Sequence, residues 1–342
     1  MEALLPQIEL SGSGLTTPVN IQGIGFSVPD KVVTNAEIIK GLNSTEQWIQ
    51  NKTGIKERRF LEDDLITSDL CLNACKEALL DANISALDID VIILSTITPD
   101  QLLPSTALVL KEKLGAFNAI PIDLNQVACA GGIYSIYLGA HLLQSNNIQN
   151  VLVIGGEVLS RITDTNDRTT RVFFGDAAGA VVLQKTKEGY GLLSYDIDSK
   201  LNYAVQRPGG GSEPLPYDED IESSLYLKMD GREVWNIATE VVPSSIIKAV
   251  DKAGLSIPEI DYFFIHQANV NIINKVLNNL NIPKEKTNYT IQDYGNTGSA
   301  TIFSCLYHAI KNNSIKNNDN IVFSAIGAGF VWGSLCFKYN KN

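Results

Sequence analysis

The chain has 342 residues, of which 44% are hydrophobic and 19% charged, and this composition predicts a globular protein with enough length for one large core or two fused cores. It excludes disordered, collagen-like and disulfide-scaffold classes. The net charge of −11 argues against a nucleic acid partner, because such binding needs Lys and Arg to neutralise phosphates. A local basic pocket for an anionic ligand remains compatible with that charge. Since no apolar run reaches roughly 18 residues, we also expect no membrane association.

The cysteines are odd in number and irregularly spaced, which is not typical of a disulfide framework. The start of the chain lacks the basic segment and long apolar stretch of a secretory signal, so we expect a reduced, cytoplasmic protein. No zinc-ligand spacing, Walker motif or convincing dinucleotide-binding fingerprint occurs, so we expect no metal and no cofactor. The five cysteines are Cys71, Cys75, Cys129, Cys305 and Cys336.

Short apolar runs alternate with helical patterns along the chain, after a presumed extension of residues 1–20. We expect strands at 91–96, 151–154, 180–183, 262–265, 321–324 and 334–338. We expect helices at 68–82, 130–144, 234–253, 270–280 and 299–311. This alternation, with strands rich in β-branched residues, predicts an α/β protein whose sheet is covered on both faces.

An internal repeat divides the chain. Residues 82–91 and 253–262, which lie 171 positions apart, both read as a helix end, a turn and an apolar strand. A second pair aligns CAGG at Cys129 with NTGS at Asn296, 167 positions apart. The repeat predicts two similar halves, 21–185 and 186–342. If a pseudo-twofold axis relates them, Cys129 and Asn296 approach one shared cavity.

Cys129 is the strongest candidate for a nucleophile. A strand leads to it and an almost wholly apolar, and therefore buried, helix follows. The free N–H groups at a helix start favour a thiolate, so the position predicts a thiol that is reactive near neutral pH. An inert core cysteine is an equally common outcome for such a position, and the other four cysteines favour that interpretation more strongly.

His266 and Asn296 are the candidate partners of Cys129. His266 directly follows the expected strand 262–265, and carboxyl ends of strands carry site residues in α/β proteins. Asn296 lies in a loop before a helix, where a turn or capping role would also suit it. The order Cys, His, Asn also occurs in papain-like cysteine proteases, and spacing alone does not exclude them. The mid-chain cysteine and its flanking residues argue against that alternative.

Four motifs resemble 3-oxoacyl-ACP synthase III, the ketosynthase III branch of the thiolase fold. They are ACAG at 128–131, HQAN at 266–269, GNT at 295–297 and GAGFVWG at 327–333. The segments STEQWI at 44–49, TGIKERR at 53–59 and DR at 167–168 also match, so the resemblance covers about residue 21 to the C-terminus. It implies a thiolase-like fold of duplicated α-β-α-β-α layered halves with two mixed sheets, and a homodimer.

The resemblance implies a two-step decarboxylating Claisen condensation. An acyl-CoA acylates Cys129, and malonyl-ACP then loses CO2 and attacks the acyl-enzyme to give 3-oxoacyl-ACP. By similarity, His266 and Asn296 donate hydrogen bonds to the thioester oxygen of the malonyl group. The backbone N–H groups of Cys129 and Ala328 form the oxyanion hole for acyl transfer. Fixed neutral donors suit this chemistry, because decarboxylation develops an enolate.

The resemblance also assigns a CoA site. Trp48 and Arg168 enclose the adenine between them, and both side chains can stack on a π-face. Lys52 stands where the family often carries an Arg near the CoA phosphates, so the charge is kept without the bidentate fork. Asn269 contacts the pantetheine arm.

The chain departs from the family pattern at the positions that usually carry basic residues for the acidic carrier protein. All of them are neutral here, which predicts weaker docking or a different acceptor, such as an unusual carrier or a CoA thioester. The neutral positions are Asn236, Asn271, Asn278 and Asn279. A substitute basic patch is expected from Lys228, Arg232, Lys248 and Lys275.

Two further departures concern the acyl pocket. Gly132 stands where a Phe is frequent beyond the nucleophile, and Leu103 replaces an aromatic residue that a dimer partner commonly contributes. Both changes remove bulk, which predicts room for an acyl group longer than acetyl.

Three functions follow from the resemblance and its departures. The first is a ketosynthase III of fatty-acid initiation, and the second is a related condensing enzyme or acyltransferase of specialised metabolism with another acceptor. The third, which the intact Cys129, His266 and Asn296 disfavour, is a silent subunit of a heteromeric synthase.

Overall fold

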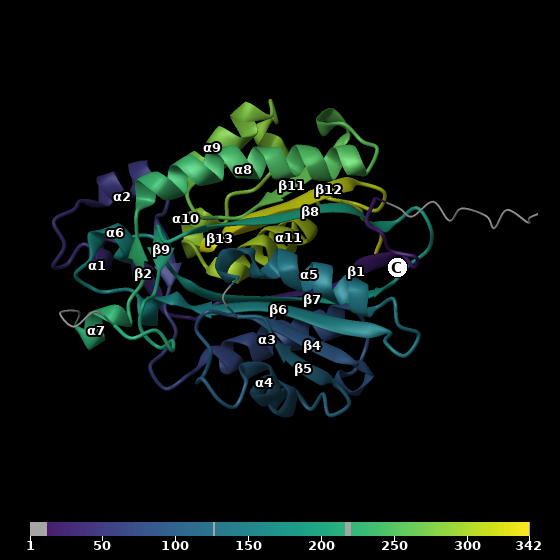
Figure 1. The fold of residues 1–342 in the computed structure, drawn as a ribbon, viewed down its shortest axis with the longest axis horizontal. Helices are drawn as coiled ribbons and strands as arrows, with labels where there is room; N and C mark the ends of the chain where they lie inside the picture. The colour runs from purple at the N-terminus through teal and green to yellow at the C-terminus, as the bar shows by residue number, and fades with distance from the viewer. Residues whose placement is uncertain (1–11, 126, 216–219, 342) are drawn as a thin grey trace, which may run out of the picture.

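The computed structural model describes residues 12–125, 127–215 and 220–341 and arranges them in five layers, alternately helices and sheets (Figure 1). Residues 1–11 of the expected N-terminal extension lie outside the described part. The rest of that extension packs on the protein, because Leu15 is buried in the main core and the first strand begins at Val19. Within the described ranges, no helix is both long and apolar enough to cross a membrane.

The first sheet is mixed and has five strands in the order β1-β7-β6-β4-β5. Strand β4 runs parallel to β5 and β6, whereas β7 runs antiparallel to β1 and β6. The strands are β1 (Val19–Ser27), β4 (Val91–Ser95), β5 (Ile120–Asp123), β6 (Asn150–Val158) and β7 (Asp176–Lys185).

The second sheet is also mixed and has four strands in the order β11-β12-β13-β8. Strand β11 is parallel to β12, and the other pairs are antiparallel. The strands are β8 (Gly191–Asn202), β11 (Tyr262–Ile265), β12 (Asn320–Gly327) and β13 (Gly329–Lys338).

Two helices lie between the sheets, and two pairs cover the outer faces (Figure 1). The central helix α5 is apolar on almost all sides because it meets a sheet on each side. The central pair is α5 (Gly131–Leu142) and α11 (Thr301–Lys311); the outer pairs are α3 (Thr67–Asp81) with α4 (Thr106–Leu114), and α8 (Gly231–Lys252) with α9 (Val270–Asn279). These layers confirm the predicted α/β class with two mixed sheets.

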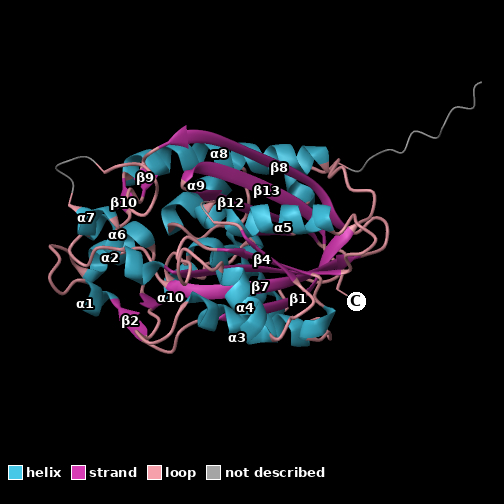
Figure 2. Ribbon diagram, turned by 60° about the horizontal axis from the view of Figure 1, so that its bottom comes forward, coloured by secondary structure: helices cyan, strands magenta, loops and turns pink. Residues whose placement is uncertain are grey.

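The shorter elements gather at one end of the molecule (Figure 2). The helices there are α1 (Asn35–Ile38), α2 (Glu46–Thr53), α6 (Arg168–Arg171), α7 (Ile221–Ser224) and α10 (Ile291–Tyr294). The strands there are β2 (Val32–Thr34), β3 (Glu57–Arg59), β9 (Val205–Gln206) and β10 (Lys228–Met229). Two of these strands line the cavity described below, through Val205 of β9 and Met229 of β10.

The internal repeat is visible in the fold, with one change of register. The 3₁₀ turns at 86–88 and 257–259 and the strands that follow them are 171 positions apart, as the sequence predicts. The turns at 128–130 and 298–300, which precede α5 and α11, are 170 positions apart. Cys129 therefore corresponds to Ser299, and its predicted pairing with Asn296 is wrong by three residues. Asn296 lies in the loop ahead of the second turn.

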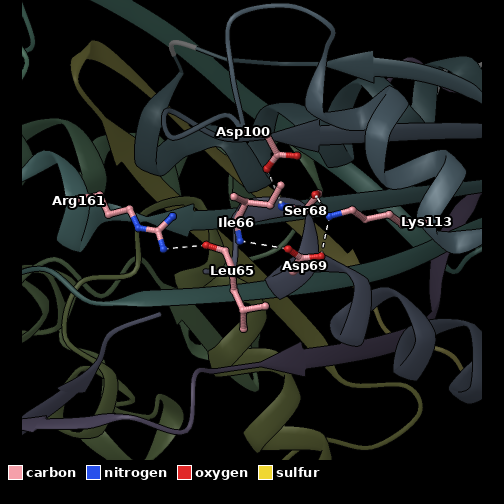
Figure 3. A network of polar contacts seen from close by, with 7 residues as sticks. All are labelled: Leu65, Ile66, Ser68, Asp69, Asp100, Lys113 and Arg161. Carbon is pink, nitrogen blue, oxygen red and sulfur yellow. Dashed lines mark hydrogen bonds and ion pairs between the residues drawn. The ribbon is translucent and has the colours of Figure 1, made fainter. Parts of the chain in front are cut away.

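A polar network fixes the start of α3 and the loop that precedes α4 (Figure 3). The Ser68 N–H donates to Asp100 Oδ1 at 2.9 Å, and Lys113 Nζ bonds both Ser68 Oγ and Asp69 Oδ1, at 2.8 and 2.6 Å. Arg161 donates to the backbone carbonyls at 62 and 65. The network joins α3, α4 and the segment after β6, and so positions the 99–105 loop.

Candidate active site

One cavity of about 1070 Å³, its open mouth included, brings together the three predicted catalytic residues. Cys129, His266 and Asn296 all contribute to its wall, although they come from three separate loops. Most of the remaining wall is apolar, which excludes water from reacting groups and strengthens polar interactions inside. This meeting of a thiol, an imidazole and a carboxamide is the arrangement a thioester chemistry needs.

Cys129 lies in the 3₁₀ turn before α5 rather than in the helix itself. The residue before it, Ala128, has φ +45°, a left-handed conformation that is strained for a residue with a Cβ. Gly327 at the end of β12 packs so closely on this turn that a Cβ there would lie 2.2 Å from the Val127 carbonyl oxygen. The turn that carries the nucleophile is thus held by the second sheet.

The sequence-based expectation of a stabilised thiolate at Cys129 is wrong. Burial raises the pKa of the Cys129 thiol to about 12, and the negative charge of Glu157 adds to this effect. A hydrogen bond from Asn296 acts in the opposite direction but is the smaller contribution. The sequence predicts the start of the helix, but it does not predict how completely the thiol is removed from water. That desolvation is the largest contribution to the pKa of Cys129. The resting nucleophile is a neutral thiol that needs a proton acceptor to react.

His266 stands where β11 ends, and its ring is tightly held. Its backbone N–H donates to Ser324 O at 2.8 Å, and its Nδ1 lies 2.6 Å from Thr301 Oγ1. Only 5% of the residue is exposed, and burial lowers its pKa to about 3. The ring is therefore neutral at physiological pH, with Nε2 as the nitrogen left for substrate.

Asn296 presents a donor to the cavity. Its backbone is fixed on both sides, because its N–H donates to Phe173 O at 2.8 Å and its carbonyl accepts from Gly175 N at 3.0 Å. Its side-chain Oδ1 accepts from Gly298 N at 2.9 Å. With the oxygen occupied, the Nδ2 group is the end that donates to the Cys129 thiol and the end that a ligand oxygen can reach.

Glu157 is a buried acid in the cavity wall that the sequence analysis missed. Its carboxylate accepts hydrogen bonds from the Ser299 hydroxyl at 3.0 Å, the Thr98 hydroxyl at 3.1 Å and the Ile97 N–H at 3.1 Å. Burial nevertheless raises its pKa to about 7. The available signal was a lone acidic residue within the otherwise apolar strand β6, since buried charges are costly without partners.

The two backbone groups expected to form the oxyanion hole lie on adjoining segments. Ala328 lines the cavity between β12 and β13. The preceding residue, Gly327, lies so close to the nucleophile that a Cβ added to it would be 3.1 Å from Cys129 N. Ala328 does not adopt a positive φ, so an alanine is unstrained there.

The four residues expected to bind CoA form two contacting pairs, Arg168 with Trp48 and Asn269 with Lys52. Arg168 stacks on Trp48, with 4.8 Å between the guanidinium carbon and the ring centroid, and it donates to Asn43 O. The two groups touch directly, so a base between them requires one to move aside. Asn269 lines the cavity and donates to the backbone carbonyl of the exposed Lys52 at 3.0 Å, which joins α9 to α2.

Neither residue assigned to the acyl pocket lines the cavity in a single chain. A Cβ on Gly132 would lie 2.7 Å from Ile302 Cδ1 and 3.2 Å from Phe303 Cε2, so these side chains fill the room expected there. Leu103 points outward and is 85% exposed. The predicted space for a long acyl group therefore has no basis at Gly132.

An apolar branch of the cavity is the better candidate for the acyl group. Leu159, Phe174 and Leu227 are almost fully buried, form a cluster of their own, and line the cavity together with Ile97 and Phe173. No sequence pattern marked these residues, because they come from three loops between strands. Their side chains form an apolar part of the cavity wall.

Lys248 lies apart from Arg232 in the expected substitute patch of basic residues. Arg232 and Lys248 both lie exposed on α8, but sixteen residues of helix separate them, about 24 Å. Lys275 is exposed on α9 and Lys228 on β10. Lys248 therefore stands apart from Arg232, beyond a Debye length at physiological salt.

Replacing His266 by Gln is expected to reduce the acid sensitivity of the fold. The folded state lowers the pKa of His266 from 6.5 to about 3, so its contribution to stability is complete above pH 6.5 and is lost as pH falls toward 3. When the pH is lowered from 7 to 5, we expect the free energy of unfolding to fall by about 2 kcal/mol more in the wild type than in the His266→Gln variant. Urea unfolding of both proteins at both pH values measures this difference. Glu157 and the other titratable groups are present in both proteins, so their contributions cancel. Equal losses in the two proteins would contradict it.

Comparison with known proteins places the chain among relatives that share nearly its whole length. A family model for 3-oxoacyl-[acyl-carrier-protein] synthase III matches residues 122–201, and its C-terminal counterpart matches 250–339. A Bacillus cereus protein named beta-ketoacyl-[acyl-carrier-protein] synthase III 1 is 39% identical over 94% of this chain and 99% of its own. A Staphylococcus aureus synthase III is 38% identical over the same shares.

Solved structures agree with these sequence relatives. The 3-oxoacyl-[acyl-carrier-protein] synthase III of Aquifex aeolicus superposes with a TM-score of 0.87 at 35% identity, covering 94% of this chain and all of that one. The Thermus thermophilus synthase III gives 0.88 at 34% identity with the same coverage. OleA of Xanthomonas campestris shares the fold at 22% identity, with a TM-score of 0.82 over 95% of this chain and 99% of that one.

Proposed function

Because the chain belongs to the 3-oxoacyl-[acyl-carrier-protein] synthase III family, it is an acyl-transferring condensing enzyme, and we propose that Cys129, His266 and Asn296 carry its two half-reactions. An acyl group passes from CoA to Cys129, and free CoA leaves. Malonyl-ACP then loses CO2, and its carbanion attacks the acyl-enzyme to give 3-oxoacyl-ACP. The observation that carries the proposal is the position of all three side chains in the wall of one cavity.

The electrostatics of the site support these roles. Loss of CO2 places negative charge on the thioester oxygen. The Nδ2 group of Asn296 and the neutral ring of His266, when its proton is on Nε2, stabilise that charge as donors. The N–H groups of Cys129 and Ala328 serve the tetrahedral intermediate of acyl transfer. A neutral His266 suits the reaction because the ring can donate a hydrogen bond without placing a charged group in an apolar cavity.

The binding partners follow from the same family. Acyl-CoA binds with its adenine at Trp48 and Arg168, its phosphates near Lys52 and its pantetheine arm along Asn269. The enzyme is cytoplasmic and a homodimer of chains with two similar halves, 21–185 and 186–342. Leu102 and Leu103 are neighbours and are 79% and 85% exposed, and this apolar pair supports a protein partner at their loop.

The charge of the surface bears on the identity of the second substrate. Asn236, Asn278 and Asn279 are exposed and uncharged on α8 and α9, and the net charge of −11 opposes an acidic carrier. These neutral positions favour, as the second candidate, a condensing enzyme of specialised metabolism with an unusual carrier or a CoA thioester as acceptor.

Intact-protein mass spectrometry after incubation with mixed acyl-CoAs tests the function. We expect one acyl adduct on the wild type and none on Cys129→Ala, and the adduct mass identifies the primer. A panel of malonyl-ACP, malonyl-CoA and 3-oxoacyl thioesters then identifies the acceptor. An unmodified wild type, or an adduct that persists in Cys129→Ala, would overturn the proposal.

Shortening Leu227 to alanine is expected to shift the primer preference toward longer chains. The residue is 7% exposed and lines the apolar branch, so its truncation adds space where we place the acyl tail. We expect the ratio of kcat/KM for octanoyl-CoA to that for acetyl-CoA to rise about tenfold or more. Leu225→Ala, two residues away and 40% exposed, is the matched control. An unchanged ratio in Leu227→Ala would place the tail elsewhere.

A further inference from the structure

Two linked hydrogen bonds connect His266 to the turn that precedes α11. Thr301 Oγ1 lies 2.6 Å from His266 Nδ1, and the same hydroxyl donates to the Gly298 carbonyl oxygen at 3.0 Å. Both residues are buried, with 5% of His266 and 1% of Thr301 exposed. A hydroxyl has one proton to give, and a carbonyl oxygen only accepts. The proton in the shorter contact therefore belongs to Nδ1.

We propose that Thr301 is a positioning residue that holds the resting His266 with its proton on Nδ1, so that Nε2 presents a lone pair to the Cys129 thiol. The proposal rests on the roles proposed above for Cys129 and His266. It is supported by the position of His266 in the cavity wall and by Nε2, which has no hydrogen-bond partner within the described part of the chain. The partner of one ring nitrogen decides what the other can do.

This tautomer supplies what the first half-reaction lacks. Cys129 rests as a thiol, so its proton must leave as sulfur attacks. The Sγ–H proton passes to His266 Nε2 while Sγ bonds the acyl carbonyl carbon. The bond from that carbon to the CoA sulfur then breaks, its electron pair stays on the CoA sulfur, and that sulfur takes the proton from Nε2. The ring ends neutral, as it began, and no further reactant is consumed.

The same hydroxyl also suits the second half-reaction. Between the half-reactions the ring changes tautomer through water in the open cavity: Nε2 takes a proton from a water molecule, and the hydroxide that remains takes the Nδ1 proton. The Thr301 hydroxyl then turns its own proton from the Gly298 oxygen to Nδ1, which holds the ring in the form that can donate from Nε2 to the malonyl thioester oxygen. A hydroxyl can accept from or donate to Nδ1, whereas a hydrocarbon can do neither. Serine at 301 should therefore preserve both half-reactions, and valine, which has the same shape as threonine, should impair them.

Nitrogen-15 NMR of histidine-labelled protein reads the tautomer directly. The chain has three histidines, so His266→Gln identifies the His266 signals. We expect the wild type to carry its proton on Nδ1. In Thr301→Val we expect that preference to be lost and Cys129 acylation to slow about tenfold to a hundredfold, the usual effect of removing such a supporting partner.

Two variants control for loss of packing or of a buried hydroxyl. Thr301→Ser keeps the hydroxyl and should retain the Nδ1 tautomer and an acylation rate within about twofold of wild type. Ser304→Ala removes a buried hydroxyl one turn further along α11, which bonds Thr301 O and Thr290 but not His266, and should behave as the wild type.

A wild-type signal with the proton on Nε2, or normal acylation in a folded Thr301→Val, would overturn the inference. If Thr301→Val does not fold, the wild-type tautomer and the Thr301→Ser rate still decide it. If no acyl-CoA acylates the wild type, the proposed function is wrong. The NMR signal tests the role of Thr301 separately, because it does not depend on acylation.

Discussion

Replacing Asn296 with alanine is expected to slow malonyl thioester decarboxylation about 10²–10³-fold, and acylation of Cys129 by less than about tenfold, because the bond from Asn296 is a minor contribution to the pKa of that thiol. The expectation follows from the orientation of the amide, whose Oδ1 is bound to Gly298 N and whose Nδ2 is left for the enolate oxygen. That donor acts on charge that develops only in the second half-reaction. CO2 release and single-turnover acylation, measured on the same preparation, separate the two steps.

The control for this substitution is another asparagine of the same region. Asn288 donates its side-chain amide to Cys305 O and does not line the cavity, so Asn288→Ala should leave decarboxylation unchanged. Asn296→Asp should be at least as impaired as Asn296→Ala, because a carboxylate offers acceptors where a donor is needed. Decarboxylation within tenfold of wild type in Asn296→Ala would remove Asn296 from the proposed machinery.

The fold could be predicted where apolar periodicity dominates. The runs at 91–96, 262–265 and 321–324 are strands because both faces of each are covered, which leaves no polar alternation. Helix α9 was equally predictable, because its buried apolar residues recur at helical spacing and form one stripe. They are Ile272, Ile273, Val276 and Leu277. In these elements local pattern and tertiary burial agree.

Two strands that escaped prediction, β5 and β8, lie at edges of the two sheets. Strand β8 continues into exposed residues over its second half, and β5 carries Pro121 at the edge of the first sheet, where a missing N–H is tolerated. Their residues lack the continuous apolar run of a central strand. Pairing with β13 and β4, respectively, makes them strands, and a single sequence does not display its partners.

The identities of the site residues were predictable, but their electrostatics were not. Cys129, His266 and Asn296 occupy turns and strand ends that the sequence marks, and the family motifs identify all three. The pKa of Cys129 depends on burial and on Glu157, a residue 28 positions along the chain. Similarly, the loss of bulk at Gly132 was visible, whereas Ile302 from the other half fills the space. Both errors arise from contacts between segments remote in sequence.

Replacing Gly327 with alanine is expected to slow acylation of Cys129 by about 10²-fold or more. The added Cβ would lie 2.2 Å from Val127 O, 2.9 Å from Ala130 N and 3.1 Å from Cys129 N, and all of these atoms are backbone. The turn must therefore move, and with it the nucleophile and the N–H groups of the oxyanion hole. A displacement of about 1 Å from the reacting geometry can cost 10²-fold in rate.

The effect of Gly327→Ala should be specific to the first half-reaction. Asn296 is held by other segments, through Phe173 O and Gly298 N, and the His266 ring is held by Thr301 Oγ1. Decarboxylation of a malonyl thioester should therefore persist and would show that the variant is folded. Gly211→Ala, at a glycine with open space and no positive φ, is the control for adding a methyl group. Wild-type acylation in Gly327→Ala would mean that the turn yields without moving Cys129, and that the close contact with β12 does not position the nucleophile.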